Sequence, residues 1–338
     1  MPRILMPVLV IGLALAVPHD STPAAPKPVC DRFAAPGGSD AQPGTKRRPL
    51  ASVQQLAKIL RPGETGCLRS GAYEPSSGPY VLSVERGGTT GAPITIRSFP
   101  GERARLVGIV VVEKGVGNVV LSRLDIEGPG VQNTVKIYGA DVIVEDSRIT
   151  NALRGSSCVI LGNASLSAIR PVIRRNRIHD CGSNAVDYNH HHGIYVSNAA
   201  DGRIVGNVIW NVASKAIQLY PNAQRMRVVE NVVDGGPPSI RGSIIIGGNA
   251  EQASSGNLVE RNVIAYARRY NIESYWEGEI GTGNVARSNC VWGGLRGNIG
   301  QQVGFSATDN LVADPQFVSR DDRDYRLGPG SRCRLVVR

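Results

Sequence analysis

The chain has 338 residues, of which 38 are Lys or Arg and 28 are Asp or Glu, so its net charge is +10. A chain of this length can hold two domains, although an all-β barrel or solenoid of similar length often forms one. Aromatic residues account for only 5% of the chain and glycine for 40 residues, which favours short strands and tight turns over helices, whose interiors disfavour glycine.

The first segment, residues 1–25, is typical of a secretory signal peptide followed by a proline-rich start. A single Arg precedes an apolar run from Ile4 to Val17, which is shorter than a membrane-spanning helix requires. No later apolar stretch in the sequence reaches that length. We therefore expect a soluble, exported protein, secreted to the extracellular space or the cell envelope, that acts as a monomer and has no membrane span.

Residues 26–66 are expected to form an N-terminal segment that contains one short capping helix. Ser52 can cap a helix that runs from about Val53 to Leu60, and a Pro-Gly pair follows as a stop signal. Such a helix would place Leu56 on its apolar face, where it can cover the open end of a repetitive core.

The six cysteines contain no CxxC pair, so a zinc site is not expected, and in an oxidising compartment disulfides are favoured. Six cysteines can be connected in several ways. We predict that cysteines pair with their neighbours along the chain, as Cys30–Cys67, Cys158–Cys181 and Cys290–Cys333.

The remainder of the chain, residues 67–338, is repetitive. An Asn followed by an apolar pair recurs at intervals of 21 to 31 residues. It is found at Asn176, Asn207, Asn231, Asn262, Asn289 and Asn310. Short strand-like phrases such as GIYVSNA and SIIIGGNA lie between these residues. Stacked repeats of this size bury one continuous apolar interior, which predicts an all-β parallel solenoid in which the turn asparagines are structural.

Several phrases resemble those of the pectate-lyase-like superfamily. PLASVQQLAKILRPGETGCLRSGAYEP resembles the family's opening segment, APITIRSFPGERARLVG its first coil, and DPQF with DYRLGPGS its closing segment. Within the superfamily the chain resembles the secreted proteins related to polysaccharide lyases of the chondroitinase B and alginate lyase type. The resemblance implies a single-stranded right-handed parallel β-helix with a short N-terminal capping helix.

Strand alternation predicts which residues face outward. If Ile194 and Val196 point into the interior, Tyr195 points out, and Gln218 does so one coil later. The residues expected to line this outer face are Lys136, Tyr195, Gln218, Tyr220, Glu273 and Tyr275, and the preceding turn carries His190, His191, His192 and Lys215. The interval of 34 residues between Ile160 and Ile194 exceeds one coil and leaves a loop that can form a wall beside this face.

These residue types can perform β-elimination at a uronic acid. That reaction needs a base for the proton beside the carboxylate, a cation that neutralises the carboxylate, and an acid for the leaving oxygen. The resemblance implies His191 or Lys215 as the base and Tyr195 or Tyr220 as the acid, with His192 as a further catalytic candidate. Lys136, Gln218, Glu273 and Tyr275 are expected to bind substrate.

The basic charge favours an acidic polysaccharide as partner. Nucleic acid is not expected, because aromatic residues do not interleave with basic ones as base stacking requires. No metal site is predicted, since consecutive histidines on an extended chain point in opposite directions, and calcium is possible by family resemblance only. The alternatives are a glycoside hydrolase on the same fold, a non-catalytic carbohydrate-binding or adhesin-like β-helix, and for the histidines a plain polar turn.

Overall fold

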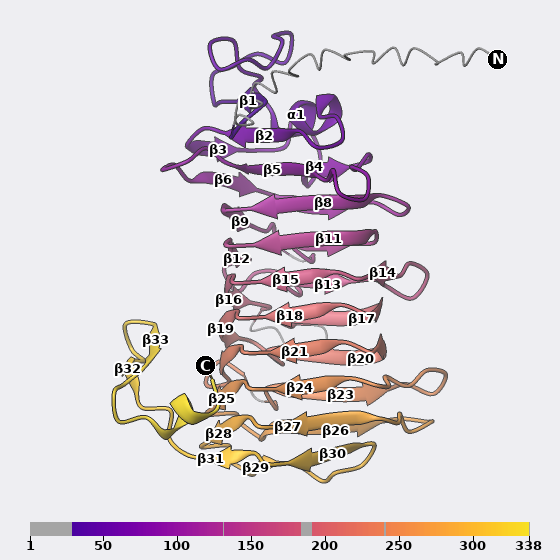
Figure 1. Cartoon of the computed structure of the whole chain (residues 1–338), viewed down its shortest axis with the longest axis vertical. Coiled ribbons are helices and arrows are strands. Elements are labelled where there is room, and N and C mark those ends of the chain that lie inside the picture. Colours follow the sequence, from indigo (N-terminus) through magenta and orange to yellow (C-terminus); the bar gives the residue numbers. More distant parts are fainter. Residues whose placement is uncertain (1–28, 131, 184–190, 240, 338) are drawn as a thin grey trace, which may run out of the picture.

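The computed structural model describes residues 29–130, 132–183, 191–239 and 241–337 (Figure 1). The predicted signal peptide and His190 therefore lie outside the described residues. Within them the chain coils repeatedly, and each coil contributes up to three short parallel strands that pair with the equivalent strands of the coils above and below. Figure 1 shows these coils stacked along the long axis of the molecule.

Equivalent strands form three stacks. The first stack consists of β4 (Tyr80–Val84), β7 (Ile109–Val112), β10 (Val135–Ile137), β13 (Val159–Leu161), β17 (Ile194–Ala200), β20 (Ile217–Gln224), β23 (Ile244–Gly248), β26 (Tyr270–Trp276) and β29 (Gly297–Ile299). The second consists of β1 (Arg32–Ala34), β2 (Thr65–Leu68), β5 (Ile94–Ser98), β8 (Gly117–Ser122), β11 (Ala140–Glu145), β15 (Val172–Arg174), β18 (Arg203–Val205), β21 (Arg227–Val229), β24 (Leu258–Glu260), β27 (Asn284–Arg287) and β30 (Phe305–Thr308). The third consists of β3 (Gly71–Tyr73), β6 (Ala104–Val107), β9 (Leu124–Glu127), β12 (Arg148–Thr150), β16 (Arg177–Cys181), β19 (Val208–Val212), β22 (Val232–Asp234), β25 (Val263–Ala265), β28 (Cys290–Trp292) and β31 (Leu311–Val312).

A few elements lie outside the three stacks. The short strand β14 (Ala168–Ile169) pairs with β11 and β17. After the last coil, β32 (Phe317–Ser319) and β33 (Asp324–Leu327) form an antiparallel hairpin, and a 3-10 helix follows at Arg332–Leu335. The hairpin is anchored to the third stack because Arg320 forms an ion pair with Asp234 at 2.8 Å.

The interior of the coils is one continuous aliphatic core. Ile194 pairs with Ile217, Ile217 with Ile244, and Ile244 with Ile272 on successive coils of the first stack. All four side chains are fully buried, as predicted for Ile194, Ile217 and Ile272. One detail of the predicted register was wrong: Ile194 pairs with Val159, so Ile160 stands beside Tyr195 and faces outward.

The repeated asparagines stack at the turn between the second and third stacks. From Asn207 onward, each accepts hydrogen bonds at Oδ1 from the backbone N–H and the side-chain amide of the asparagine one coil before; Asn207, for example, donates both to Asn231 at 2.9 Å. Asn176, the first of the series, accepts instead from the backbone N–H of Ser147. We call Asn176, Asn207, Asn231, Asn262, Asn289 and Asn310 the asparagine ladder. Its amides also donate to backbone carbonyls, which satisfies polar groups that the fold buries. The predicted structural role is confirmed.

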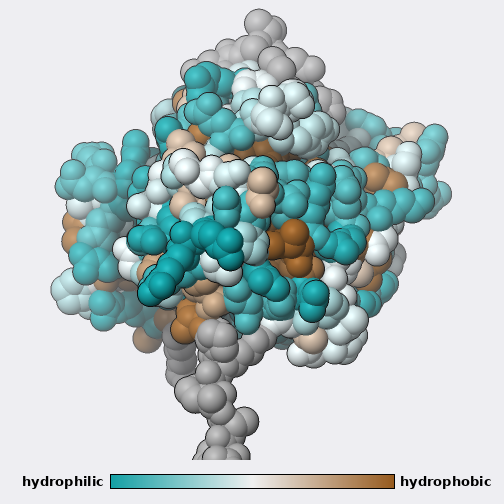
Figure 2. All heavy atoms as spheres, turned by 90° about the horizontal axis from the view of Figure 1, so that it is seen from above, coloured by the Kyte–Doolittle hydropathy of each residue, from teal (hydrophilic) through white to brown (hydrophobic). Residues whose placement is uncertain are grey.

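The N-terminal end of the core is covered by α1 (Val53–Ile59). Ser52 caps this helix by accepting a hydrogen bond from Gln55 N–H, as predicted, and Leu56 is fully buried. Seen from above, this end of the molecule presents a largely hydrophilic surface with only small apolar areas (Figure 2). The helix therefore shields the apolar interior from solvent at the point where coil stacking begins.

All three predicted disulfides are present: Cys30–Cys67, Cys158–Cys181 and Cys290–Cys333. The first ties the N-terminal segment to β2 and the third ties β28 to the C-terminal 3-10 helix. Such bridges are consistent with an oxidising, extracellular location. None of the helices among the described residues is long and apolar enough to cross a membrane.

Candidate functional site

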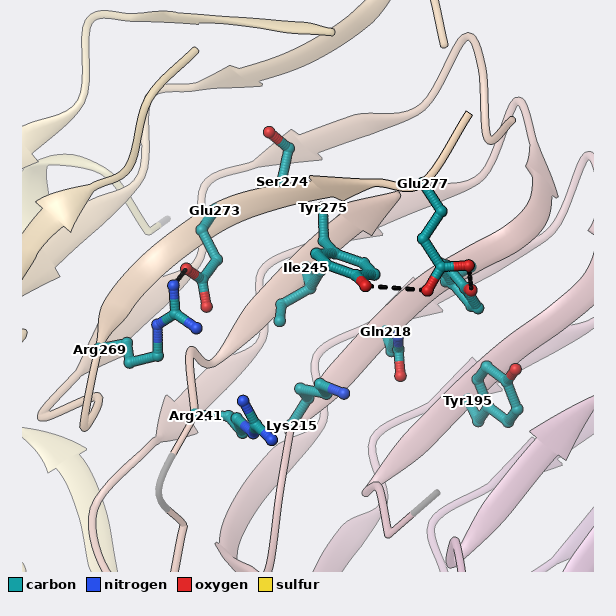
Figure 3. Close-up of a pocket in the computed structure, with 11 residues that line it drawn as sticks. Tyr195, Lys215, Gln218, Arg241, Ile245, Arg269, Glu273, Ser274, Tyr275 and Glu277 are labelled. Atoms are coloured by element: carbon teal, nitrogen blue, oxygen red, sulfur yellow. Dashed lines mark hydrogen bonds and ion pairs between the residues drawn. The ribbon is translucent and has the colours of Figure 1, made fainter. Parts of the chain in front are cut away.

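A cavity of about 450 Å³ opens on the outer face of the first stack, over strands β17 to β26. We call it the Tyr195 cavity. Its lining residues are Tyr195, Lys215, Gln218, Tyr220, Arg241, Ile245, Arg269, Glu273, Ser274, Tyr275 and Glu277 (Figure 3). The inward side chains of these four strands fill the core, so the cavity is lined from their outer face.

Strand register explains why residues far apart in the sequence meet here. Tyr195 pairs with Gln218, Gln218 with Ile245, and Ile245 with Glu273, so these side chains form one outward column. The column continues upward through Ile160 to Lys136. Neighbouring members are separated by one interstrand spacing of about 4.8 Å.

Three cations line one end of the cavity, and each comes from the turn just before a strand of the first stack. Lys215 precedes β20, Arg241 precedes β23, and Arg269 precedes β26. Figure 3 shows them on the side of the cavity where Glu273 also lies. Coil stacking thus brings one cation from each of three successive turns into a local concentration of positive charge.

Glu273 lies among these cations and is itself almost completely buried. Its carboxylate forms an ion pair with Arg269 at 3.4 Å. Burial raises the pKa of the Glu273 carboxyl above its usual value, and the charges of Arg269, Lys215 and Arg241 oppose that shift without cancelling it. Glu273 can therefore hold a proton at a higher pH than an exposed glutamate does.

Tyrosines and a second carboxylate form the opposite end of the cavity. The hydroxyl of Tyr275 donates to Glu277 Oε1 at 2.8 Å, and that of Tyr220 donates to Glu277 Oε2 at 3.2 Å. Burial, followed by the charge and hydrogen bond of Glu277, raises the pKa of Tyr220 to about 12. Both tyrosines thus stay protonated at neutral pH, and Glu277 fixes the positions of their rings.

The floor of the cavity contains polar groups that are shielded from water. Gln218 is only 5% exposed, and within the part of the chain that the structure describes its Oε1 atom accepts no hydrogen bond. A buried amide oxygen without a donor is costly. Tyr195 stands beside it in the column, and burial raises the pKa of the Tyr195 hydroxyl. The floor therefore offers an acceptor and a hydroxyl to a ligand that enters the cavity.

Six of the predicted site residues line the cavity: Tyr195, Lys215, Gln218, Tyr220, Glu273 and Tyr275. Three others do not. His191 lies beside Ser183 in the turn after β16, where its Nδ1 is 3.2 Å from the Ser183 carbonyl. His192 is fully buried with its ring edge against Tyr195, 4.9 Å between ring centroids, so it supports that tyrosine from within.

Lys136 belongs to the outward column but stands two coils above Tyr195. Its amine donates to Gln132 at 3.0 Å and lies over the ring of Tyr80. His190 and the loop residues Asp187 and Tyr188 fall outside the described residues.

The sequence reasoning missed Arg241, Arg269 and Glu277. The two arginines lie in the turns that correspond to the Lys215 turn one and two coils later, but each is one residue further from the paired isoleucine than Lys215 is, so strand register does not align them with it. Glu277 comes immediately after the end of β26, and its position depends on how that strand turns away. Nothing in the strand alternation indicates such a turn.

The cavity continues into a neighbouring hollow of about 530 Å³ towards the C-terminal coils. The two share Arg269, Glu273, Ser274, Tyr275 and Glu277. Beyond them the hollow is lined by Trp276 and Arg296 among others. The site is therefore an open groove that runs along the stacked coils and can hold an extended molecule.

A calcium ion does not fit the residues described here. Calcium takes six to eight oxygen ligands, several of them carboxylates. Over residues 29–130, 132–183, 191–239 and 241–337 no group of three or more His, Cys, Asp or Glu side chains gathers as a metal site. In the cavity, Glu273 is paired with Arg269 and Glu277 is held by two tyrosines.

Two relatives match parts of the sequence. An uncharacterized protein of Bacillus subtilis, YwoF, is 30% identical over 106 residues, which is 31% of this chain and 22% of that protein. Pectate lyase PEL9 of Emericella nidulans is 35% identical over 78 residues, which is 23% of this chain and 18% of the lyase. The matched segments thus span about a fifth of the length of each relative.

Solved structures match the whole fold. The structure of pectate lyase Pel9A has a TM-score of 0.60 at 12% identity and covers 89% of this chain and 90% of its own. A rhamnogalacturonan lyase has a TM-score of 0.60 at 15% identity and covers 86% of this chain and 91% of its own. A family model described as the right handed beta helix region matches residues 107–310, which confirms the predicted handedness, and the chain therefore belongs to the right-handed parallel β-helix family.

Proposed function

We propose that the protein binds an acidic polysaccharide in the Tyr195 cavity and cleaves it by β-elimination at a uronic acid residue. The observation that carries this proposal is the convergence of Lys215, Arg241 and Arg269 with Tyr195 and Tyr220 around one open groove. Cations, a proton acceptor and proton donors are the groups that this reaction needs.

The substrate carboxylate would bind between Arg241 and Arg269, since guanidinium groups match carboxylates in geometry and charge. Neutralising that carboxylate makes the proton on the adjacent carbon more acidic. Lys215, which lines the cavity and is only 8% exposed, would accept that proton when its amine is neutral. As the carbon–carbon double bond forms, the bond to the leaving sugar oxygen breaks.

The leaving oxygen would take its proton from Tyr195. This hydroxyl lies in the column beside Gln218, and its raised pKa keeps it protonated at neutral pH. Tyr220 and Tyr275 would serve instead as a sugar-binding surface, because both hydroxyls already donate hydrogen bonds to Glu277. Aromatic rings offer sugars an apolar face with a polar edge.

The relatives support a polysaccharide as the substrate class. One relative by sequence is a pectate lyase, and the solved structures with the same fold include a pectate lyase and a rhamnogalacturonan lyase. The groove also continues beyond the cavity along the coils, as a polymeric ligand requires. Fold alone does not select an activity, so the proposal depends on the side chains of the cavity.

Hydrolysis is the second candidate, and one observation favours it. Two carboxyl groups, Glu273 and Glu277, line the same cavity, and burial raises the pKa of Glu273 as the general acid of a glycosidase requires. Elimination and hydrolysis differ in their products, since only elimination leaves an unsaturated sugar that absorbs in the ultraviolet.

The test is a screen of the purified protein against polygalacturonate, alginate, chondroitin and a neutral glucan. Ultraviolet absorbance and new reducing ends would be followed in parallel. The double variant Arg241→Gln/Arg269→Gln should lose activity, whereas the exposed pair Arg47→Gln/Arg48→Gln, with the same change in net charge, should retain it. Reducing ends without absorbance would favour hydrolysis, and binding without either signal would make the protein a carbohydrate-binding β-helix.

A further inference from the structure

A second cleft, of about 620 Å³, lies on another face of the molecule, over the N-terminal half of the third stack and the turn before it. We call it the arginine cleft. Its lining residues are Gly101, Glu102, Arg103, Arg123, Asp125, Asp146, Ser147, Arg148, Arg175 and Arg177. It shares no residue with the Tyr195 cavity, and its strands belong to a different sheet.

The carboxylates of the arginine cleft are already engaged by particular arginines. Glu102 is held by Arg69 outside the cleft, at 2.7 Å. Asp146 is paired with Arg175 at 2.8 Å, and that guanidinium lowers the pKa of Asp146. Asp125 is 3.6 Å from Arg103. Three carboxylates face five arginines of the cleft, so the cleft keeps an excess of positive charge.

The excess charge is carried by Arg123, Arg148 and Arg177. Arg123 and Arg148 are exposed, and neither forms an ion pair with any carboxylate of the described residues. Arg148 pairs in register with Asp125 of the coil before, a carboxylate that is already 3.6 Å from Arg103. On its other side it pairs with Arg177 of the next coil, which places two like charges opposite each other at a spacing of about 4.8 Å. Such a pair is unfavourable by itself.

Arg177 is held in place from two sides. Its guanidinium lies over the ring of Trp210 at 4.7 Å, and its Nη2 donates to the carbonyl of Arg323 at 3.0 Å. The opposed arginine pair is therefore built into the fold by the C-terminal hairpin region and the third stack. An anion that bridges the two guanidinium groups would remove their repulsion.

We propose that the arginine cleft is a second binding site, for a polyanionic polysaccharide, distinct from the Tyr195 cavity. Its cations repeat from coil to coil along the axis of the molecule, so an extended chain of carboxylates fits it better than one small anion. The residues that line the cleft include no aromatic side chain. The nearby Trp210 ring contacts the Arg177 guanidinium and stacks on the His179 ring, with 4.4 Å between the ring centroids. The surface therefore lacks the exposed aromatic platform on which nucleic-acid bases stack.

The test uses the full chain and polygalacturonate as the probe, with binding measured by affinity gel electrophoresis and calorimetry at two salt concentrations. The double variant Arg123→Gln/Arg148→Gln removes two cleft charges, and Arg47→Gln/Arg48→Gln removes two charges from an exposed segment that lines neither the cleft nor the cavity. We expect the cleft variant to bind about tenfold more weakly and with a smaller salt dependence. The control should change by less than about twofold.

Equal weakening by the two double variants would overturn the proposal, because it would show attraction by overall charge alone. Unchanged binding of the cleft variant would overturn it as well, and so would tighter binding of a DNA duplex than of polygalacturonate. Failure of this inference is separable from failure of the proposed function. Arg241→Gln/Arg269→Gln tests the Tyr195 cavity through product formation, whereas the cleft variant should turn over a short oligosaccharide at the parent's rate.

Discussion

The asparagine ladder and the outward column of the first stack recur on the same coils, yet they differ in composition. From Asn176 to Asn310 the ladder keeps asparagine at every coil; its members are bonded to one another, and all except the last, Asn310, are buried. The outward column, from Lys136 through Ile160, Tyr195, Gln218 and Ile245 to Glu273, holds a different residue at almost every coil.

The difference follows from what each position must satisfy. A buried turn leaves backbone N–H and C=O groups that need hydrogen-bond partners. An asparagine amide supplies both a donor and an acceptor that can reach the neighbouring coil. An outward position on a strand has its backbone groups paired already by neighbouring coils, so its side chain is free of that demand. The same solenoid can therefore keep a uniform interior, which consists of the asparagine ladder and the inward core residues and which we call the frame, and still carry chemically varied side chains on its surface.

The largest expected effect comes from the cavity. Replacing Lys215 by Ala should reduce turnover of the polyuronate found by screening by about 10²–10⁴-fold, the range that a general base contributes. The thermal unfolding temperature should stay close to that of the parent. The matched control is Lys114→Ala, an exposed lysine in the turn after β7, which should keep full activity. Activity retained by Lys215→Ala would remove the proposed base.

A substitution in the asparagine ladder should have the opposite result to Lys215→Ala, in that it should mainly lower the stability of the protein. Asn231→Ala removes the acceptor for the N–H and amide of Asn207 and the donor to the Ile204 carbonyl. Each buried group left without a partner costs about 1–3 kcal/mol, so we expect unfolding to become easier by about 3 kcal/mol or more. Urea unfolding measures this change.

Asn222→Ala is the matched comparison for the ladder. Asn222 is part-buried on the outer surface, where its amide donates to Asn198 at 3.2 Å. Its loss should cost no more than about 1 kcal/mol. If the two variants were equally stable, the ladder would be no more than a repeated surface turn and the contrast between frame and surface would fail.

The frame was predictable from the sequence because it repeats. The asparagines and the inward isoleucines recur with the coil, and local rules fix their environment. The cysteines do not recur in this way, and their pairing was predicted from their order along the chain. The outward column was predictable in register for the same reason, which is how Tyr195, Gln218 and Glu273 were found together.

What could not be predicted depends on side-chain packing at particular turns. His192 lies two residues before the start of β17, where strand alternation does not fix its orientation, and it turns into the protein and packs against Tyr195. Arg241 and Arg269 reach the cavity because their turns differ in length yet return to the same place above the strands. Turn geometry of this kind is set by tertiary contacts and leaves no periodic signal.

A smaller effect is expected for the hydroxyl of Tyr220. Tyr220→Phe removes the hydrogen bond from this hydroxyl to Glu277, while the hydrogen bond from Tyr275 to Glu277 remains. We expect affinity for the polysaccharide to fall about twofold to fivefold, as for one hydrogen bond, and the free energy of unfolding to change by less than about 0.5 kcal/mol. Tyr275→Phe should behave alike, since the two hydroxyls share one carboxylate. A large loss of stability would mean that the tyrosines belong to the frame.

The smallest effect concerns Glu273, which stands in the outward column but is buried like a residue of the frame. Burial raises the pKa of its carboxyl, against the opposing charge of Arg269. A carboxyl whose pKa is higher in the folded than in the unfolded state contributes stability that is fully present below the unfolded pKa and is lost as the pH rises through the folded pKa. The parent should therefore lose stability relative to Glu273→Gln as the pH rises from the unfolded pKa, about 4.3, through the raised folded pKa. Urea unfolding of both proteins across that range measures the difference. As a control, Asn231→Ala changes no titratable group, so its free energy of unfolding should differ from that of the parent by an amount that does not vary with pH.

If the parent instead gained stability over Glu273→Gln as the pH rose, the ion pair with Arg269 would outweigh burial. Glu273 would then be an ordinary paired carboxylate without the raised pKa that the hydrolytic alternative requires.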